Sequence, residues 1–256
     1  MSEDKKVGTA KLLFASAKYM GLNPSWLTEN GLFAINTKAG ERYINFARSP
    51  LNSDIGASLA KNKYMTRVIL GRHGLPNIPF ASPQTLPQAK EFLSRHKKII
   101  VKPIRGLGAQ DIHIIDHVDQ LDDFNVKLYI FEKYISGREM RYLVLDGAVI
   151  AVHESEYGVS VEETRPLKRI SYPQPTWNSS LSSLSIQISD ILGLQFAAVD
   201  FLVDEDENAH ILEVNTMPGL KWFHAPTSGP PVDVAQLFLK SLITELNTKA
   251  TSVKYA

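Results

Sequence analysis

Three oxygen-bearing side chains lie on two consecutive segments of alternating hydrophobicity toward the C-terminal end of the chain. Asp200 belongs to FAAVDFLV (196–203). Glu213 and Asn215 belong to AHILEVN (209–215). The acidic run DEDEN between the segments predicts a hairpin turn, which places Asp200 roughly opposite Glu213. Like charges at paired positions destabilise a hairpin, and a bound cation removes this conflict. Such a set of oxygen ligands suits Mg²⁺ or Mn²⁺; the alternative is a solvated sheet face with incidental charges.

A lysine followed by two glycines indicates a phosphate-binding loop in IIVKPIRGLGAQDI (99–112). Lys102 ends an apolar strand, and Gly106 and Gly108 open the loop. Glycines let the backbone approach phosphates closely, and the lysine supplies a positive charge. The segment nearly spells the dinucleotide-binding pattern G-x-G-x-x-G, but Asp111 breaks the pattern and a strand, not a helix, is expected to follow. A glycine-containing hairpin turn is an equally good interpretation of this segment alone.

A third segment, FEKYISGREMRYLVL (131–145), places Glu132 and Glu139 on either side of Gly137. We expect two strands joined by a short turn. A site for adenosine needs a backbone donor and acceptor, an apolar slot and a carboxylate for the ribose, all of which this segment can supply. Any charged hairpin could supply them as well, so the segment alone does not establish a nucleotide site.

Composition excludes several classes of protein. The 256 residues are 44% hydrophobic and 21% charged, as in ordinary globular proteins, and the net charge of +1 creates no field that recruits nucleic acid or an acidic membrane. The absence of cysteine excludes disulfides and thiolate sites and fits a reducing compartment. We find neither a signal peptide nor an apolar run of about 18 residues. We therefore expect a cytoplasmic protein that binds neither nucleic acid nor a membrane.

The elements that must position these residues are helices mixed with runs of hairpins. Helical spacing and stop signals predict helices at about 9–20, 57–73, 86–96, 179–193 and 232–246. Alternation predicts hairpins or strands at 31–47, 97–104, 111–116, 126–135, 139–155, 162–171 and 196–215. This arrangement favours an α+β fold in two lobes over a parallel doubly wound sheet.

The order of the motifs is more specific than any one of them. LNSDIGASLAKNKYMTRVILGRHGLPNIP is followed by IIVKPIRGLGAQDI, FEKYISGREMRYLVL, AAVDFLV and HILEVNTMPGL. The series resembles the ATP-grasp superfamily, which includes D-alanine–D-alanine ligase, glutathione synthetase and cyanophycin synthetase. The resemblance covers about residues 50–246, and the C-terminal run looks most like the ATP-grasp module of cyanophycin synthetase. It implies an ATP-grasp fold, with ATP bound between two α+β lobes.

The resemblance also implies a site for ATP and magnesium, with one role for each matching residue. The implied residues are the phosphate lysines Lys63 and Lys102, the phosphate-loop glycines Gly106 and Gly108, the adenine-binding linker Glu132, Lys133 and Ile135, the ribose-binding Glu139, and the metal ligands Asp200, Glu213 and Asn215. Arg141 lies where some relatives have an arginine that faces phosphate or acyl substrate. We therefore expect Arg141 and Lys102 to serve catalysis.

The sequence departs from the family pattern in two places. Asp111 replaces the glycine common at the end of the phosphate loop, where it could stiffen the loop or repel phosphate. Residues 1–50, a helix and a hairpin, stand where relatives carry a full α/β domain before the ATP-grasp domain. We expect the ATP-grasp domain to span 51–256, with a small lobe at about 75–135 and a large lobe at about 136–250. We then expect substrate recognition to be reduced, to be shifted to the ATP-grasp loops, or to depend on a homodimer or a partner subunit that supplies acceptor-site contacts.

The leading hypothesis is an ATP-dependent ligase that joins a carboxylate to an amine through an acylphosphate. Both substrates would be small molecules or peptides, and an acidic substrate could bind Arg141, Arg165, Lys168 or Arg169, although solvated charges explain these residues equally well. Two alternatives remain open: an ATP-grasp kinase or synthetase that tags peptides or proteins, and a non-catalytic ATP-binding accessory or regulatory subunit.

Overall fold

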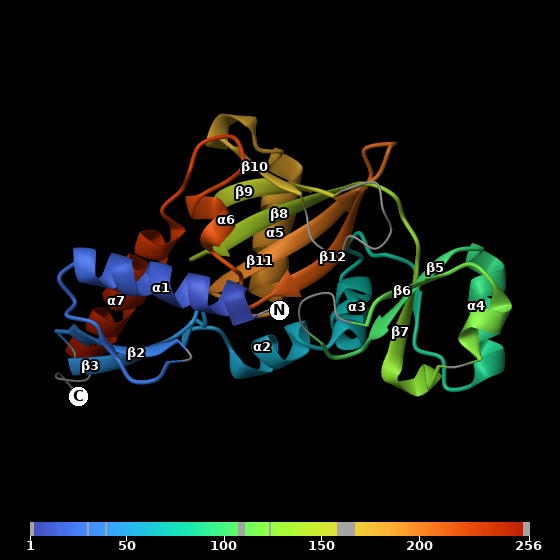
Figure 1. Ribbon diagram of the computed structural model, residues 1–256, viewed down its shortest axis with the longest axis horizontal. Coiled ribbons are helices and arrows are strands. Elements are labelled where there is room, and N and C mark those ends of the chain that lie inside the picture. The colour runs from blue at the N-terminus through green and yellow to red at the C-terminus, as the bar shows by residue number, and fades with distance from the viewer. Residues whose placement is uncertain are drawn as a thin grey trace.

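The computed structural model describes residues 3–29, 31–38, 40–106, 111–122, 124–157 and 167–252 (Figure 1). The helices are α1 (Glu3–Tyr19), α2 (Asp54–Ala60), α3 (Lys63–Arg72), α4 (Leu86–His96), α5 (Ser179–Ile191), α6 (Lys221–His224) and α7 (Val234–Ser252). Short 3₁₀ helices span Val118–Leu121, Val126–Leu128 and Gln174–Thr176. The strands are β1 (Ser25–Trp26), β2 (Leu32–Thr37), β3 (Gly40–Asn45), β4 (Phe80–Ala81), β5 (Ile99–Pro103), β6 (His113–Ile115), β7 (Tyr129–Lys133), β8 (Arg138–Leu145), β9 (Ala148–Glu156), β10 (Lys168–Tyr172), β11 (Phe196–Val203) and β12 (Ala209–Asn215).

The larger sheet has the strand order β10-β9-β8-β11-β12, and each pair in this order is antiparallel. Because side chains alternate between its faces, one face is apolar along its length and packs against α5 through residues such as Tyr142 and Val199 (Figure 1). The opposite face is apolar only at one end, where Leu143 and Ala198 join the core formed with α1 and α7. The rest of that face carries the polar residues of the candidate site.

The four-stranded sheet, here called the smaller sheet, has the strand order β4-β7-β5-β6 and packs against α4, whereas a separate three-stranded sheet, β1-β2-β3, belongs to the N-terminal elements. Its core contains Phe92 and Leu93 of α4 together with Val101 and Phe131 of the sheet. Figure 1 shows this sheet and α4 at one end of the molecule, α1 and α7 at the other, and α3 and the larger sheet between them. The combination of helices with antiparallel sheets confirms the predicted α+β fold class.

The N-terminal elements share a core with the larger sheet. Leu13 of α1 and Phe33 of β2 are fully buried in the same cluster as Phe196 of β11 and Phe238 of α7. A core that joins such distant segments stabilises the N-terminal and C-terminal ends of the chain together. The division into an N-terminal segment (1–50) and two lobes remains a prediction.

The prediction of one continuous helix at 57–73 is wrong. The structure has two helices there, because the side chain of Asn62 accepts a hydrogen bond from the Met65 N–H at 3.0 Å and so caps a new helix. Asparagine favours such caps over helix interiors, because its amide competes with the backbone for hydrogen bonds. The break places Lys63 in the first turn of α3.

Most other predicted elements are found with shifts at their ends, the largest at the start of α1 and at the end of α7. The strand predicted at 162–171 is found in part as β10, and residues 162–166 of that prediction lie outside the described residues. The 126–135 segment begins as a 3₁₀ helix and becomes strand only at Tyr129. Asp146–Gly147 forms the predicted hairpin turn, and both residues have positive φ, of 52° and 71°. Within the described ranges, none of the helices has the length and hydrophobicity that crossing a membrane requires.

Candidate active site

The β11–β12 hairpin places the two predicted metal-binding carboxylates opposite each other. The register pairs Asp200 with Glu213, which confirms the predicted opposition. The next pair is Phe201 with Ile211, so Leu212 is the extra residue of a β-bulge. Bulges of this kind change the direction of nearby side chains and recur beside active sites.

Arg141 on β8 offsets the negative charge of this pair. It is the register partner of Asp200 and binds it through two contacts, Nε–Oδ1 at 2.5 Å and Nη2–Oδ2 at 2.6 Å. Arg141 Nη2 also lies 3.9 Å from Glu213 Oε1. Burial raises the pKa of Asp200 to about 7, although Arg141 opposes the rise and Glu213 adds to it. The conflict that we expected a cation to remove is thus partly removed by an arginine.

The oxygen ligands remain suited to a hard cation. Glu213 keeps 43% of its side chain exposed, and Asn215 lies two residues further along β12, so its side chain shares the same face. The Asn215 Oδ1 accepts a hydrogen bond from the Met217 N–H at 2.9 Å. In the part of the chain that the structure describes, no group of three His, Cys, Asp or Glu side chains could hold a metal. Two carboxylates and one amide are a small set of the kind that Mg²⁺ uses, with water and phosphate completing its shell.

A second charged cluster includes the predicted phosphate lysine Lys102. Glu132 of β7 is fully buried and binds two cations, Lys102 Nζ at 2.6 Å and Arg67 Nε at 2.8 Å. Burial acts to raise the pKa of Glu132, but Lys102 and Arg67 lower it to about 2. Glu132 is therefore ionised and holds the predicted phosphate lysine Lys102. Sequence reasoning missed Arg67, whose only signal is a basic residue inside the apolar stretch of α3.

Lys63 connects α3 to the start of the predicted phosphate loop. Its Nζ donates to the Gly106 carbonyl at 3.3 Å, and its backbone N–H donates to the Ile104 carbonyl at 3.0 Å. Burial lowers the pKa of Lys63, the carboxylate of Glu213 opposes this, and the ammonium of Lys102 reinforces it. The structure thus brings Lys63, Lys102 and Glu213 within electrostatic reach of one another.

The end of the loop explains how an aspartate can replace glycine there. Gly108 lies outside the described residues, but Asp111 has φ of 57°, in the left-handed region that glycine favours. Its carboxylate contacts His113 Nε2 at 2.6 Å and accepts from the Tyr129 hydroxyl at 2.7 Å. The hydrogen bonds with His113 and Tyr129 hold the pKa of Asp111 below its usual value. The aspartate is therefore tied to the strands of the smaller sheet.

Two backbone N–H groups of the predicted adenine-binding linker already donate hydrogen bonds to other parts of the protein. The Lys133 N–H donates to the Pro79 carbonyl at 2.9 Å, and the Tyr134 N–H donates to the Lys98 carbonyl at 3.1 Å. The Ile135 N–H has no backbone partner among the described residues, so it is the donor of this linker best placed to read a base.

The predicted ribose-binding Glu139 follows this linker closely in sequence and lies on β8, on the polar face of the larger sheet. It accepts hydrogen bonds from the Ser155 hydroxyl at 3.0 Å and from the Tyr157 hydroxyl. Arg169 Nη1 lies 3.6 Å from its Oε1. Arg165 lies outside the described residues, and Lys168 forms an exposed ion pair with Glu156.

The register shows a polar row that sequence reasoning did not identify. Glu213, Asp200, Arg141, His153 and Ser171 are successive register partners across β12, β11, β8, β9 and β10. Only the pairing of distant strands aligns them. The structure therefore joins the predicted metal ligands to the predicted catalytic arginine, with a histidine and a serine beyond it.

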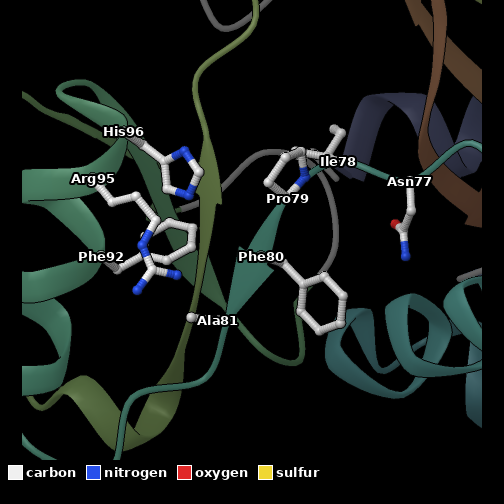
Figure 2. A pocket seen from close by; sticks show the side chains of 8 residues that line it. All are labelled: Asn77, Ile78, Pro79, Phe80, Ala81, Phe92, Arg95 and His96. Carbon is white, nitrogen blue, oxygen red and sulfur yellow. The ribbon is translucent and has the colours of Figure 1, made fainter.

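Two cavities have different relations to these residues. One of about 480 Å³ is lined by Asn77, Ile78, Pro79, Phe80, Ala81, Phe92, Arg95 and His96. Figure 2 shows that Phe92, Arg95 and His96 come from α4, whereas Phe80 points away from that helix. None of the predicted site residues that the structure describes lines this cavity. The other, of about 440 Å³, is lined by Asp54, Ala57, Ser58, Lys61, Arg105 and Gly106 and lies at the Lys63–Gly106 contact, so it is the cavity adjacent to the predicted chemistry.

Comparison with known proteins defines the class to which this fold and site belong. The sequence model of the family described as "ATP-grasp domain" matches residues 60–219. The chain therefore belongs to the ATP-grasp family, which confirms the resemblance and the fold expected from it.

Individual relatives agree with this assignment. A D-alanine–D-alanine ligase of Aquifex aeolicus is 27% identical over 139 residues, 47% of this chain and 46% of that protein. The tetrahydromethanopterin:alpha-L-glutamate ligase of Methanocaldococcus jannaschii is 23% identical over 195 residues, 69% of this chain and 65% of that protein. The chain thus spans about half to two thirds of the length of these relatives. A bifunctional glutathione synthetase from Pasteurella multocida has the same fold, with a TM-score of 0.69 at 14% identity over 93% of this chain and 44% of that one.

Proposed function

We propose that this chain is an ATP-dependent ligase that joins a carboxylate to an amine through an acylphosphate. The observation that supports it most is the convergence around α3. There Lys63 contacts the phosphate loop at Gly106 and lies within electrostatic reach of both Lys102 and Glu213. The proximity of two predicted phosphate cations to a predicted metal-binding carboxylate supports phosphoryl transfer, which needs both at one place.

ATP would bind with its phosphates near the first turn of α3 and its base near the linker. Lys63, Lys102 and the loop containing Gly106 and Gly108 would hold the phosphates. The backbone of Lys133–Ile135 would read adenine, with Glu132 fixing Lys102 from below and Glu139 binding the ribose. The Ile135 N–H, which has no backbone partner among the described residues, and the buried Lys102–Glu132 pair support this arrangement.

Asp200, Glu213 and Asn215 would hold Mg²⁺, with Mn²⁺ as a possible substitute. When bound, the ion supplies positive charge that neutralises phosphate oxygens during transfer. Arg141 already binds both Asp200 oxygens and lies near Glu213, so it would help to balance the charge of this site and would face the transferred phosphoryl group.

The reaction would proceed in two displacements. A substrate carboxylate oxygen attacks the γ-phosphorus, the bond to the β,γ-bridging oxygen breaks, and ADP leaves. The amine nitrogen then attacks the acyl carbon, the carbon–oxygen bond to phosphate breaks, and the amine releases a proton to solvent. The protein would act through positioning and electrostatic stabilisation, with Lys102 and Arg141 as the catalytic residues.

The substrates would be small molecules or peptides, as for the two ligases named above, whose names specify D-alanine and L-glutamate. Arg169 is our candidate for a group that orients an acidic substrate, since its buried Nε has no hydrogen-bond partner among the described residues. A homodimer or partner subunit would complete the acceptor site. The cysteine-free composition supports a cytoplasmic location.

One observation favours a second candidate, a nucleotide-binding subunit without turnover. Arg141 occupies both oxygens of Asp200 and so takes the place that a cation would need. Such a protein would bind ADP but release none from ATP.

An ADP-release screen against amino acids, dipeptides and polyamines, with mass spectrometry of the products, tests the proposal. We expect ADP release that requires both a carboxylate and an amine, and a product lighter than the two substrates by one water. Glu213→Gln should abolish release, whereas Glu205→Gln, on the exposed turn of the same hairpin, should not. Unchanged release in Glu213→Gln would show that the metal assignment is wrong.

A further inference from the structure

Arg67 is a buried arginine whose side chain contacts three separate parts of the fold. It is 2% exposed and projects from α3. Its Nε binds Glu132 Oε1 of the smaller sheet at 2.8 Å. Its Nη1 donates to Asn77 Oδ1 at 3.2 Å and to the Ile211 carbonyl, and its Nη2 donates to the Leu212 carbonyl at 2.8 Å. One guanidinium thus joins a helix, the smaller sheet and the larger sheet.

The contacts with β12 fall on its bulge. Leu212 is the extra residue that lets Glu213 pair with Asp200 while Ile211 pairs with Phe201. The Leu212 carbonyl and the Glu213 N–H belong to the same planar peptide unit. By holding the carbonyls of Ile211 and Leu212, Arg67 fixes the orientation of the peptide that carries Glu213.

The contact with Glu132 extends the same constraint to the phosphate lysine. Glu132 uses Oε1 for Arg67 and Oε2 for Lys102, so both cations share one carboxylate. Because the Glu132 pKa is about 2, this carboxylate is charged throughout the neutral range. A displacement of Arg67 would therefore move Lys102 and the Glu213 peptide together.

We propose that Arg67 is a positioning residue that fixes Glu213 relative to Lys102 and thereby couples metal binding to nucleotide binding. This inference rests on the proposed function, because it takes Lys102 as a phosphate ligand and Glu213 as a metal ligand. It differs from a purely structural role in one respect: the loss of the carbonyl contacts acts on the metal more than on the nucleotide.

Arg67→Lys separates these contacts. Lysine keeps the charge beside Glu132, but a single ammonium cannot reproduce the planar fork that reaches Glu132 and two carbonyls at once. Arg72→Lys is the matched control, because Arg72 is exposed in the last turn of the same helix.

The first readout is hydrogen exchange in the ligand-free protein. We expect amides of residues 211–214 to exchange about tenfold faster in Arg67→Lys, because an edge peptide loses its restraint. The second readout is calorimetric titration of ADP at increasing Mg²⁺. The Mg²⁺ concentration that half-saturates this dependence should rise about tenfold, as for the loss of groups that orient metal ligands. Arg72→Lys should match the wild-type protein in both.

Unchanged exchange at 211–214, or an unchanged Mg²⁺ dependence, would overturn the inference. So would a fall in melting temperature with faster exchange throughout the protein and no change in Mg²⁺ dependence, since this is what a structural role predicts. If Arg67→Lys does not fold, Asn77→Ala removes the 3.2 Å acceptor that orients Nη1 and should give the same changes at smaller size. Neither readout needs turnover, so a failed substrate screen beside these changes would reject the ligase and not the coupling.

Discussion

Glu132 and Asp200 are both buried carboxylates that bind an arginine, yet their pKa values move in opposite directions. Glu132 has two cations, Lys102 and Arg67, which lower its pKa to about 2 against the effect of burial. For Asp200, burial prevails over Arg141, and the nearby Glu213 and Glu139 help to raise its pKa to about 7.

The difference shows that the number of neighbouring charges, and not burial alone, decides what a buried carboxylate can do. On the smaller sheet, two cations surround one carboxylate. Glu132 therefore stays ionised and can hold Lys102 rigidly. The larger sheet holds a carboxylate with too little positive charge, which gains from a further cation. The second arrangement is the one expected at a metal site.

The largest effect is expected from a change that breaks the charged cluster of Glu132, Lys102 and Arg67. Glu132→Gln leaves Arg67 and Lys102 buried without their anion, which should lower the free energy of unfolding by about 3–5 kcal/mol. Urea denaturation measures this change. Glu91→Gln removes an exposed ion pair with Arg95 on α4, which packs against the same sheet, and should cost less than about 0.5 kcal/mol. Equal effects of the two changes would mean that burial of the cluster contributes nothing.

A smaller effect is expected for the carboxylate of the larger sheet. Asp200→Asn should change the free energy of unfolding at pH 7 by less than about 2 kcal/mol, because the removal of a buried charge, which the raised pKa of Asp200 shows to be unfavourable, offsets the two charged hydrogen bonds that Arg141 loses. The same variant should lose the rise in melting temperature that Mg²⁺ and ADP give the wild-type protein. If Asp200→Asn lowered the free energy of unfolding more than Glu132→Gln does, the carboxylate of the larger sheet would be the more stabilising of the two.

The pH dependence should separate the two carboxylates by sign. The Asp200 pKa is raised in the folded state from 3.8 to about 7, so its contribution is present below pH 3.8 and is lost as the pH rises through 7. The Glu132 pKa is depressed from 4.5 to about 2, so its contribution is present above pH 4.5 and is lost as the pH falls through 2. In chelator, urea midpoints between pH 4 and 7 should depend less on pH in Asp200→Asn than in the wild type. An unchanged dependence would exclude Asp200 as its source.

The smallest effect concerns an exposed carboxylate. Asp111→Gly removes the contacts with His113 and Tyr129 but relieves a positive φ, so we expect a change in the free energy of unfolding smaller than that of Asp200→Asn. Thermal unfolding provides the measurement. A change as large as that of Asp200→Asn would mean that the hydrogen bonds of this exposed carboxylate matter as much for stability as those of a buried one.

Much of the fold and part of the site could be predicted from local patterns. The helix at 86–96 and the hairpin turn at Asp146–Gly147 follow from period and turn chemistry. The opposition of Asp200 and Glu213 follows from one short turn. The break at Asn62 was missed because a cap competes with helix continuation over only a few residues, and apolar periodicity continues across it.

The sequence by itself determined the elements, the order of the motifs and the family, because these depend on neighbours in the chain. Only the tertiary structure decided the counter-ions. Arg67 is 65 residues from Glu132 and 144 from Ile211, and Arg141 is 59 from Asp200. Such pairs form because charges that lose water on packing must find partners among the side chains brought to the same place. No spacing along the chain specifies which partners these will be.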